Sequence, residues 1–170
     1  MTTLREIQSR FMEEINVVDD LAQIVLKGHL VIEELLTEAL QRFVHHSDYI
    51  ASARLQFHQK LNLCRAISVS EQDNEMWELI AKINNIRNHL SHSLGDEERV
   101  RKVRSLKSHY EQLFGRESLD AVSEMDEDSA VCMLAISGCL GFLHTFLGEV
   151  QSFEAMINRL QKVFKPEKDA

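Results

Sequence analysis

The stretch VDDLAQIVLKGHLVIEELLTEALQRFVH, from Val18 to His45, decides the fold. Its apolar residues recur three and four positions apart, which is the spacing that places side chains on one face of an α-helix. They are dense enough to predict a helix in a central position of a bundle. These residues are Leu21, Ile24, Val25, Val31, Ile32, Leu35, Leu36, Ala39, Leu40 and Phe43.

The same periodicity recurs on both sides of this stretch and predicts an all-α fold. Further helices are expected near residues 2–14, 53–66, 75–91, 97–114 and 129–163. The stretch HHSDYIAS, at 45–52, is expected to break the pattern, and a helix cap is expected near Asp73 or Asn74. Gly115 is expected just beyond the end of a helix. One proline and six glycines in 170 residues suit long helices.

The length of 170 residues predicts one domain, organised in three parts. Residues 1–116 are expected to form a helical bundle. Residues 117–128 contain six acids and no base, which predicts a solvated acidic linker whose last acids suit the start of a helix. Residues 129–170 are expected to form a long C-terminal helix that packs on the bundle, on a dimer partner, or on both.

Charge and cysteine content exclude several classes of protein. The balance of 19 Lys and Arg against 27 Asp and Glu gives a net charge of −8, which excludes a protein coated with basic charge but allows a local basic patch. Cys64, Cys132 and Cys139 include no CxxC pair, so neither a disulfide framework nor a zinc ribbon is indicated. We expect buried, reduced thiols and a cytoplasmic location. The N-terminal residues do not resemble a signal peptide.

The segment from Ser129 to Gly148 contains no Asp, Glu, Lys or Arg and is long enough to span a bilayer. Acidic residues flank it on both sides, and it contains polar residues and three glycines. We therefore expect a helix buried on most sides rather than a membrane span. The series Ala135, Gly138 and Gly141 predicts a seam of close helix packing; alternatively, these glycines only weaken or kink the helix.

The helix expected at 75–91 carries the most informative residues, INNIRNHLSH from Ile83 to His92. At about 100° per residue, one arc faces the core and a second arc is polar. The polar arc contains amides, a hydroxyl and an imidazole, with a guanidinium at its boundary and no carboxylate or lysine, which indicates contact with a partner or ligand. The core arc consists of Met76, Leu79, Ile80, Ile83, Ile86 and Leu90. The polar arc consists of Asn84, Asn88, Ser91 and His92, and Arg87 lies at the boundary between the two arcs.

The run Arg87-Asn88-His89-Leu90-Ser91-His92 resembles the signature of the HEPN superfamily, in which an arginine, commonly followed by asparagine, precedes a histidine by a few residues. GHLVIEELL at 28–36 and LQFHQKLNLCRAI at 55–67 also resemble bacterial HEPN-like proteins. The resemblance covers about Val18 to Lys107. It implies that residues 1–116 form a HEPN-like helical bundle, with the long C-terminal helix outside the matched part.

This resemblance implies a metal-independent endoribonuclease that acts on RNA as a cytoplasmic homodimer, without a cofactor, in a bacterial toxin–antitoxin or anti-phage defence system. His92 would be the general acid and base, because imidazole titrates near neutral pH. Arg87 would neutralise charge on the phosphoryl oxygens, and Asn88 would hold the histidine or the phosphate. An antitoxin or regulatory protein would be a further partner.

Two other functions are open. One is a non-catalytic HEPN-like dimerisation or adaptor module, in which Arg87 and His92 make structural contacts. The other is a helical transcriptional co-regulator similar to the mannitol repressor. Catalysis requires Arg87 and His92 in a cleft between two copies, whereas a structural role predicts that both are buried. His89 lies outside the polar arc and is expected to be exposed.

A basic block follows the motif from Arg99 to Lys107, with five bases and no acid. It predicts an RNA phosphate track formed by Arg99, Arg101, Lys102, Arg104 and Lys107. Two alternatives are a solvated face with Glu97–Arg101 and Glu98–Lys102 ion pairs, and a docking surface for an acidic partner such as an antitoxin.

Other histidines give weaker signals. His29 and Glu33, four residues apart, are expected to form an internal hydrogen-bonded pair rather than a metal site, because no third ligand shares their spacing. His45, His46 and Asp48 form an incomplete ligand set, so no metal is expected there.

Overall fold

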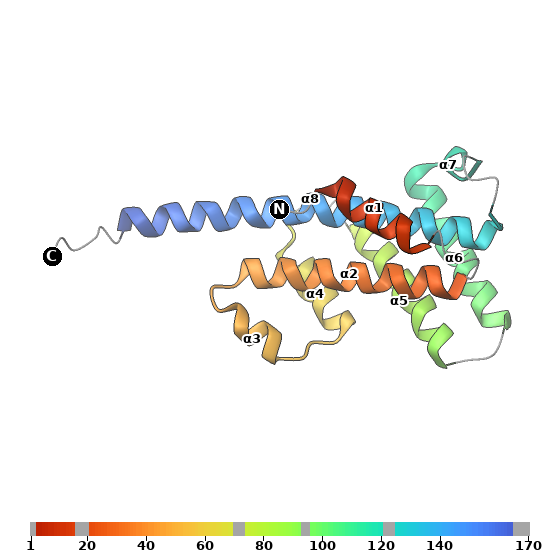
Figure 1. The fold of residues 1–170 in the computed structure, drawn as a ribbon, viewed down its shortest axis with the longest axis horizontal. Coiled ribbons are helices and arrows are strands. Elements are labelled where there is room, and N and C mark those ends of the chain that lie inside the picture. The colour runs from red at the N-terminus through yellow and green to blue at the C-terminus, as the bar shows by residue number, and fades with distance from the viewer. Residues whose placement is uncertain (1–2, 16–20, 70–73, 93–95, 121–124, 165–170) are drawn as a thin grey trace.

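The chain folds into a bundle of helices in the computed structural model, which describes residues 3–15, 21–69, 74–92, 96–120 and 125–164 (Figure 1). Within these ranges no strand occurs, so the predicted all-α fold with a long C-terminal helix is confirmed. The helices are α1 (Leu4–Ile15), α2 (Leu21–Phe43), α3 (Ser47–Ser52), α4 (Phe57–Ile67), α5 (Asn74–His92), α6 (Asp96–Phe114), α7 (Glu117–Asp120) and α8 (Glu127–Phe164).

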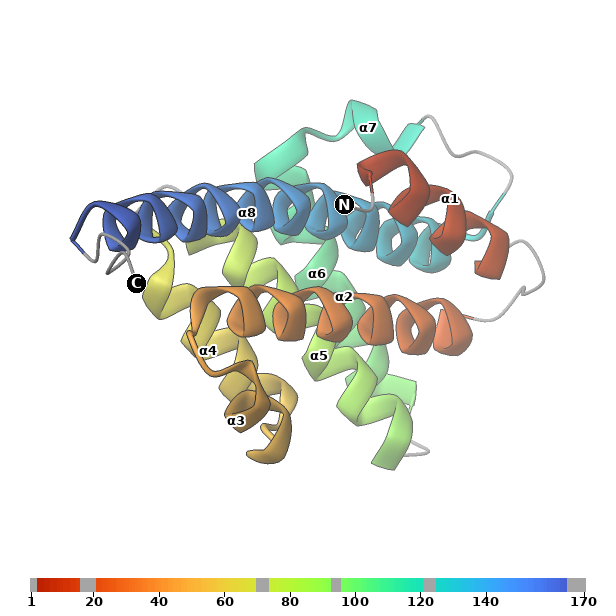
Figure 2. The ribbon, with the colours of Figure 1, turned by 60° about the vertical axis from the view of Figure 1, so that its left-hand side comes forward.

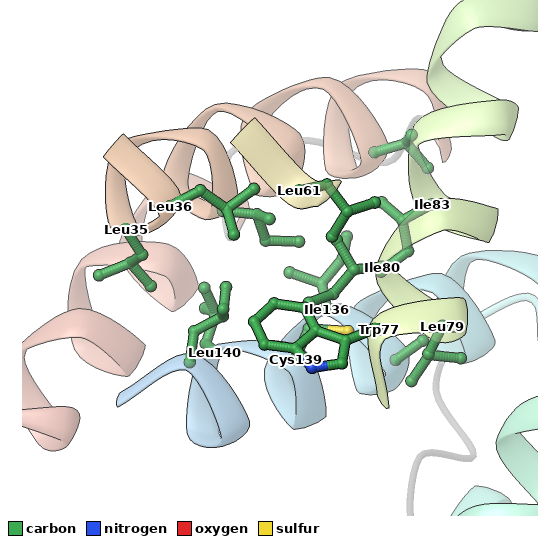
Figure 3. Packing of buried hydrophobic residues seen from close by; sticks show 14 of the residues in the cluster. Leu35, Leu36, Leu61, Trp77, Leu79, Ile80, Ile83, Ile136, Cys139 and Leu140 are labelled. Carbon is green, nitrogen blue, oxygen red and sulfur yellow. The ribbon is translucent and has the colours of Figure 1, made fainter. Parts of the chain in front are cut away.

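Helices α2 and α8 run side by side through the centre of the molecule, and α4, α5 and α6 pack around them (Figures 1 and 2). Most of the apolar face predicted for α2 is buried, with Ile24, Ile32, Leu36 and Ala39 fully covered, whereas Val31 is partly exposed and Phe43 is exposed. Figure 3 shows where side chains of α2, α4, α5 and α8 meet in one core. Burial of this apolar surface is the main force that holds the helices together.

Helix α8 is long and apolar enough to cross a membrane by length and composition alone, but 61% of its most apolar stretch is buried inside the bundle. The expected burial of its two cysteines is confirmed, because Cys132 and Cys139 are both covered. Burial raises the pKa of the Cys132 thiol to about 12 and that of the Cys64 thiol to about 12. These thiols are small apolar core groups at neutral pH.

Glycine packing differs in part from the predicted seam. A Cβ at Gly138 would lie 3.0 Å from the ring of Phe114, so this glycine does permit a close contact, although with a side chain rather than a backbone. Gly141 has nothing within 4 Å of a Cβ, and its place in the seam was predicted wrongly. The tightest contact is at Gly28 of α2, where a Cβ would lie 2.5 Å from Ile136 of α8. Gly28 is therefore the residue that lets these two helices approach.

Two short helices lie where connections were expected. The stretch 45–52 interrupts the long helix as predicted, but its residues Ser47–Ser52 form α3. Helix α4 begins at Phe57 rather than near residue 53, because Gln56 donates its backbone N–H to the Gln59 side chain in a cap (2.8 Å). In the acidic linker, Glu117–Asp120 form α7, and Asp126 caps α8 by accepting the backbone N–H of Ser129 (3.0 Å).

Candidate functional site

The predicted core face of α5 is confirmed. Leu79, Ile80, Ile83 and Ile86 are at most 1% exposed, and Met76 and Leu90 pack against the core. Trp77 is buried as well, with its ring edge-on to Phe142 and Phe146 of α8. Trp77 lies outside the predicted apolar arc. It is buried because α8 covers a second side of α5 near the start of that helix. The polar residues of the candidate site occupy the later turns of the same helix.

The polar arc begins inside the bundle at Asn84. The His29 imidazole of α2 donates from Nε2 to the Asn84 side-chain oxygen at 3.0 Å, and its ring stacks on Phe57 of α4 with centroids 4.2 Å apart. His29 is 3% exposed. The contact joins three helices directly before the motif.

This contact corrects the predicted His29–Glu33 pair. Glu33 instead accepts a hydrogen bond from the Lys60 ammonium group of α4 at 2.7 Å. The prediction considered neighbours on one helix only, whereas helices α4 and α5 offer each side chain a better oriented partner. Lys60 and Glu33 remain partly exposed beside the buried imidazole.

The pKa of His29 is lowered from its ordinary value, primarily because burial disfavours the charged imidazolium. The hydrogen bond to Asn84 acts in the opposite direction, and the positive charge of Arg87 lowers the pKa further. The imidazole is therefore neutral at neutral pH.

The motif itself lies at the end of α5. Arg87 is partly exposed and donates from Nη1 to the side-chain oxygen of the exposed Asn88 at 3.2 Å. Helix α5 continues without a break to His92, but the side chains of Ser91 and His92 lie outside the described residues. Positions 87 and 92 are about 140° apart around the helix and about 7.5 Å apart along it.

His89 was expected to be exposed, and this prediction was wrong. Its side chain is 7% exposed, and Nδ1 lies 3.7 Å from a carboxylate oxygen of Glu98 on α6. Helix α6 packs antiparallel on this side of α5. Lys82 donates to the Ser105 hydroxyl at 2.9 Å, and His109 Nε2 donates to the backbone oxygen of Glu75 at 2.8 Å. This packing is a tertiary effect that the helical wheel does not show.

The basic block does not form one face of α6. Arg101 and Arg104 are exposed, while Arg99, Lys102 and Lys107 are partly buried. The predicted Glu98–Lys102 pair is present at 3.4 Å, but Arg101 lies 3.5 Å from Glu98 rather than pairing with Glu97. Lys107 reaches Glu127 at the start of α8. Carboxylates therefore already contact three of the five bases.

Within one chain, Asn84 and Asn88 lie on a different side of α5 from the basic block. The α6 contacts involve Lys82 and His89, whereas Asn84 and Asn88 point away from that side at about 100° per residue. An RNA strand that touched both Asn88 and the basic block would have to pass around the end of α5, or contact the block of a second copy.

The remaining histidine pair shows no metal-binding geometry. The rings of His45 and His46 lie edge to face, with centroids 4.9 Å apart. In the part of the chain that the structure describes, no group of three His, Cys, Asp or Glu side chains is arranged to hold a metal ion.

No family model, curated protein or solved structure matches this chain.

Proposed function

We propose that this protein is a metal-independent endoribonuclease of the HEPN type that works as a homodimer in a bacterial toxin–antitoxin or anti-phage defence system. One observation carries the proposal. A single uninterrupted helix presents the partly exposed guanidinium of Arg87, oriented by the Asn88 amide, five residues before His92. A site on a regular helix holds its groups more precisely than a loop does.

The proposed reaction is a transesterification within RNA. His92 takes the proton from a ribose 2′-hydroxyl, whose oxygen then attacks the adjacent phosphorus. The bond from phosphorus to the 5′-oxygen of the next nucleotide breaks, this oxygen takes a proton from water, and His92 returns its own proton to water. The products are a 2′,3′-cyclic phosphate and a 5′-hydroxyl. Arg87 donates hydrogen bonds to the phosphoryl oxygens, on which negative charge grows in the transition state.

Helix geometry supports a site shared by two copies. Because positions 87 and 92 are separated by about 140° around α5, one phosphodiester does not easily contact both residues of the same chain. A two-fold axis near the end of α5 would place Arg87 of one copy beside His92 of the other. We therefore assign one arginine and the partner's histidine to each site.

The buried contact between His29 and Asn84 supports this arrangement by fixing α5 one turn before Arg87. Catalytic groups need supporting contacts that restrict their position. On α6, the exposed Arg101 and Arg104 are the proposed first contacts for RNA. Arg99 is partly buried, and Lys102 and Lys107 would bind phosphate only in competition with Glu98 and Glu127.

One observation favours the non-catalytic module instead. Asn84, a member of the polar arc, is used inside the chain rather than for a ligand. If the other polar residues make similar structural contacts across a dimer, then Arg87→Ala and His92→Ala would weaken association. RNA would remain intact with all variants.

The test is cleavage of labelled single-stranded RNA in the presence of EDTA. We expect Arg87→Ala and His92→Ala each to lower the cleavage rate by at least about 100-fold, with helicity and association unchanged. His58→Ala and Arg116→Ala are matched controls, because both residues are exposed and lie outside the motif. Equal cleavage by all four variants would exclude Arg87 and His92 as catalytic residues.

A further inference from the structure

Helix α8 carries an apolar seam that is longer than the bundle. Apolar residues alternate at steps of four and three over its length, which is the heptad spacing of a helix that packs against another helix. The series is Cys132, Ile136, Cys139, Leu143, Phe146, Val150, Phe153, Ile157, Leu160 and Phe164. The six residues from Cys132 to Val150 are at most 4% exposed.

The second part of the seam is uncovered. No residue of α8 after Val150 is buried, and Phe153, Leu160 and Phe164 are 40%, 44% and 78% exposed. Met156 and Val163 widen the exposed apolar face. Figures 1 and 2 show why: α8 extends beyond the end of α2, whose last residue, Phe43, stacks on Phe153. The spacing that packs the first part of α8 continues here without a neighbouring helix.

The charges on this segment are ordered along the helix. Glu149 and Glu154 come first, and Arg159 and Lys162 follow. A parallel pair of such helices would place like charges side by side, whereas an antiparallel pair places the acids of one against the bases of the other. Glu154 also lies 4.0 Å from Arg42, at the edge of ion-pair distance. The charge order therefore fits a second copy of this same segment in the opposite direction.

We propose that residues 150–164 of α8 form an interface that pairs antiparallel with the same residues of a second copy. Met156 lies near the two-fold axis. Phe164 of each copy then reaches the hollow lined by Phe43, Ile67, Val69, Phe146, Val150 and Phe153 of the other copy. When two helices pair along apolar residues spaced alternately four and three positions apart, each of these side chains packs among four residues of the facing helix.

This interface is separate from the one in the proposed nuclease. The C-terminal ends of α5 and α8 lie on opposite sides of the bundle (Figures 1 and 2). A chain that used both surfaces would form a tetramer from two kinds of two-fold contact if the two axes intersect at right angles. The α8 interface involves no residue of α5, so its outcome is independent of whether RNA is cleaved.

Molecular mass in solution tests the interface. We expect the double substitution Leu160→Glu, Val163→Glu to halve the mass of the full-length protein in light scattering, whether the starting assembly is a dimer or a tetramer. Ala155→Glu adds one negative charge outside the seam and should leave the mass unchanged. Because all these residues are exposed, none of the changes should affect folding, which circular dichroism checks.

Cysteine cross-linking tests the direction of pairing. Met156→Cys should form a disulfide between copies, while Val163→Cys should not, because antiparallel pairing separates the two 163 positions by roughly 20 Å. The native cysteines are buried and do not interfere. A mass unaffected by the double substitution would overturn the interface, and efficient cross-linking at position 163 would overturn the antiparallel direction. RNA cleavage measured on the same variants reports on the α5 site separately.

Discussion

His29 shows how one buried side chain couples stability to pH. Its pKa is lowered by burial, so between its folded pKa and the ordinary value near 6.5 the unfolded chain binds the proton that the folded chain does not. The contribution of His29 to the free energy of unfolding is therefore fully present above the ordinary pKa, and it decreases as the pH falls below that value. For one proton the slope is at most about 1.4 kcal/mol per pH unit.

Urea denaturation at pH 7.5, 6.5 and 5.5 checks this prediction. His29→Gln keeps an amide that can donate to Asn84 but has no group that titrates, so its free energy of unfolding should decrease less between pH 7.5 and 5.5 than that of the wild type. The difference between the two proteins removes the contribution of other titrating groups. An identical decrease in both would show that His29 is not responsible.

The burial or the partner of a single residue was predicted correctly where it depends on spacing within that residue's own helix. The buried face of α5, the burial of Cys132 and Cys139, and the Glu98–Lys102 pair are all of this kind. The partner of His29 and the exposure of His89 were predicted wrongly, because Asn84 and Glu98 come from other helices. Helical spacing carries no information on which helices meet.

At the scale of elements, the approach of α2 and α8 at Gly28 predicts opposite effects for two glycine substitutions. Gly28→Ala forces a methyl group against Ile136, and overpacking of this kind costs about 1–3 kcal/mol. Gly141→Ala meets nothing within 4 Å, so the better helix propensity of alanine should stabilise the protein by up to about 1 kcal/mol.

Urea unfolding of both variants measures these effects. We expect the midpoint to fall for Gly28→Ala and to rise for Gly141→Ala, although the chemical change is the same. A rise at both positions would mean that Ile136 moves aside without cost, and that Gly28 does not determine the distance between the two helices.

The long helices could be predicted from sequence, because each has an apolar face that repeats over several turns. The short helices α3 and α7 could not, since six and four residues are too few for a periodic signal. The start of α4 was placed four residues early, because its boundary depends on the Gln56–Gln59 cap rather than on an apolar pattern. Element boundaries depend on local hydrogen bonds.

At the scale of the whole molecule, the motif on α5 and the basic block on α6 could both be found from sequence. Their relative positions in the fold could not. Arg87 is partly exposed and Asn88 is exposed near the C-terminal end of α5, as contact with a partner or ligand requires. The basic block lies beside that helix on the side of Lys82 and His89, away from Asn88, which only the packing of α6 reveals. The uncovered end of α8 depends on where α2 stops, and the sequence of α8 alone does not indicate it.

The central claim, that Arg87 of one copy and His92 of the other act on one phosphodiester, is tested most directly by mixing two inactive variants. After subunit exchange between Arg87→Ala and His92→Ala chains, half of the dimers are mixed, and each mixed dimer has one complete site. We expect about a quarter of the wild-type RNA cleavage rate in EDTA. A mixture as inactive as either variant alone would contradict the shared site.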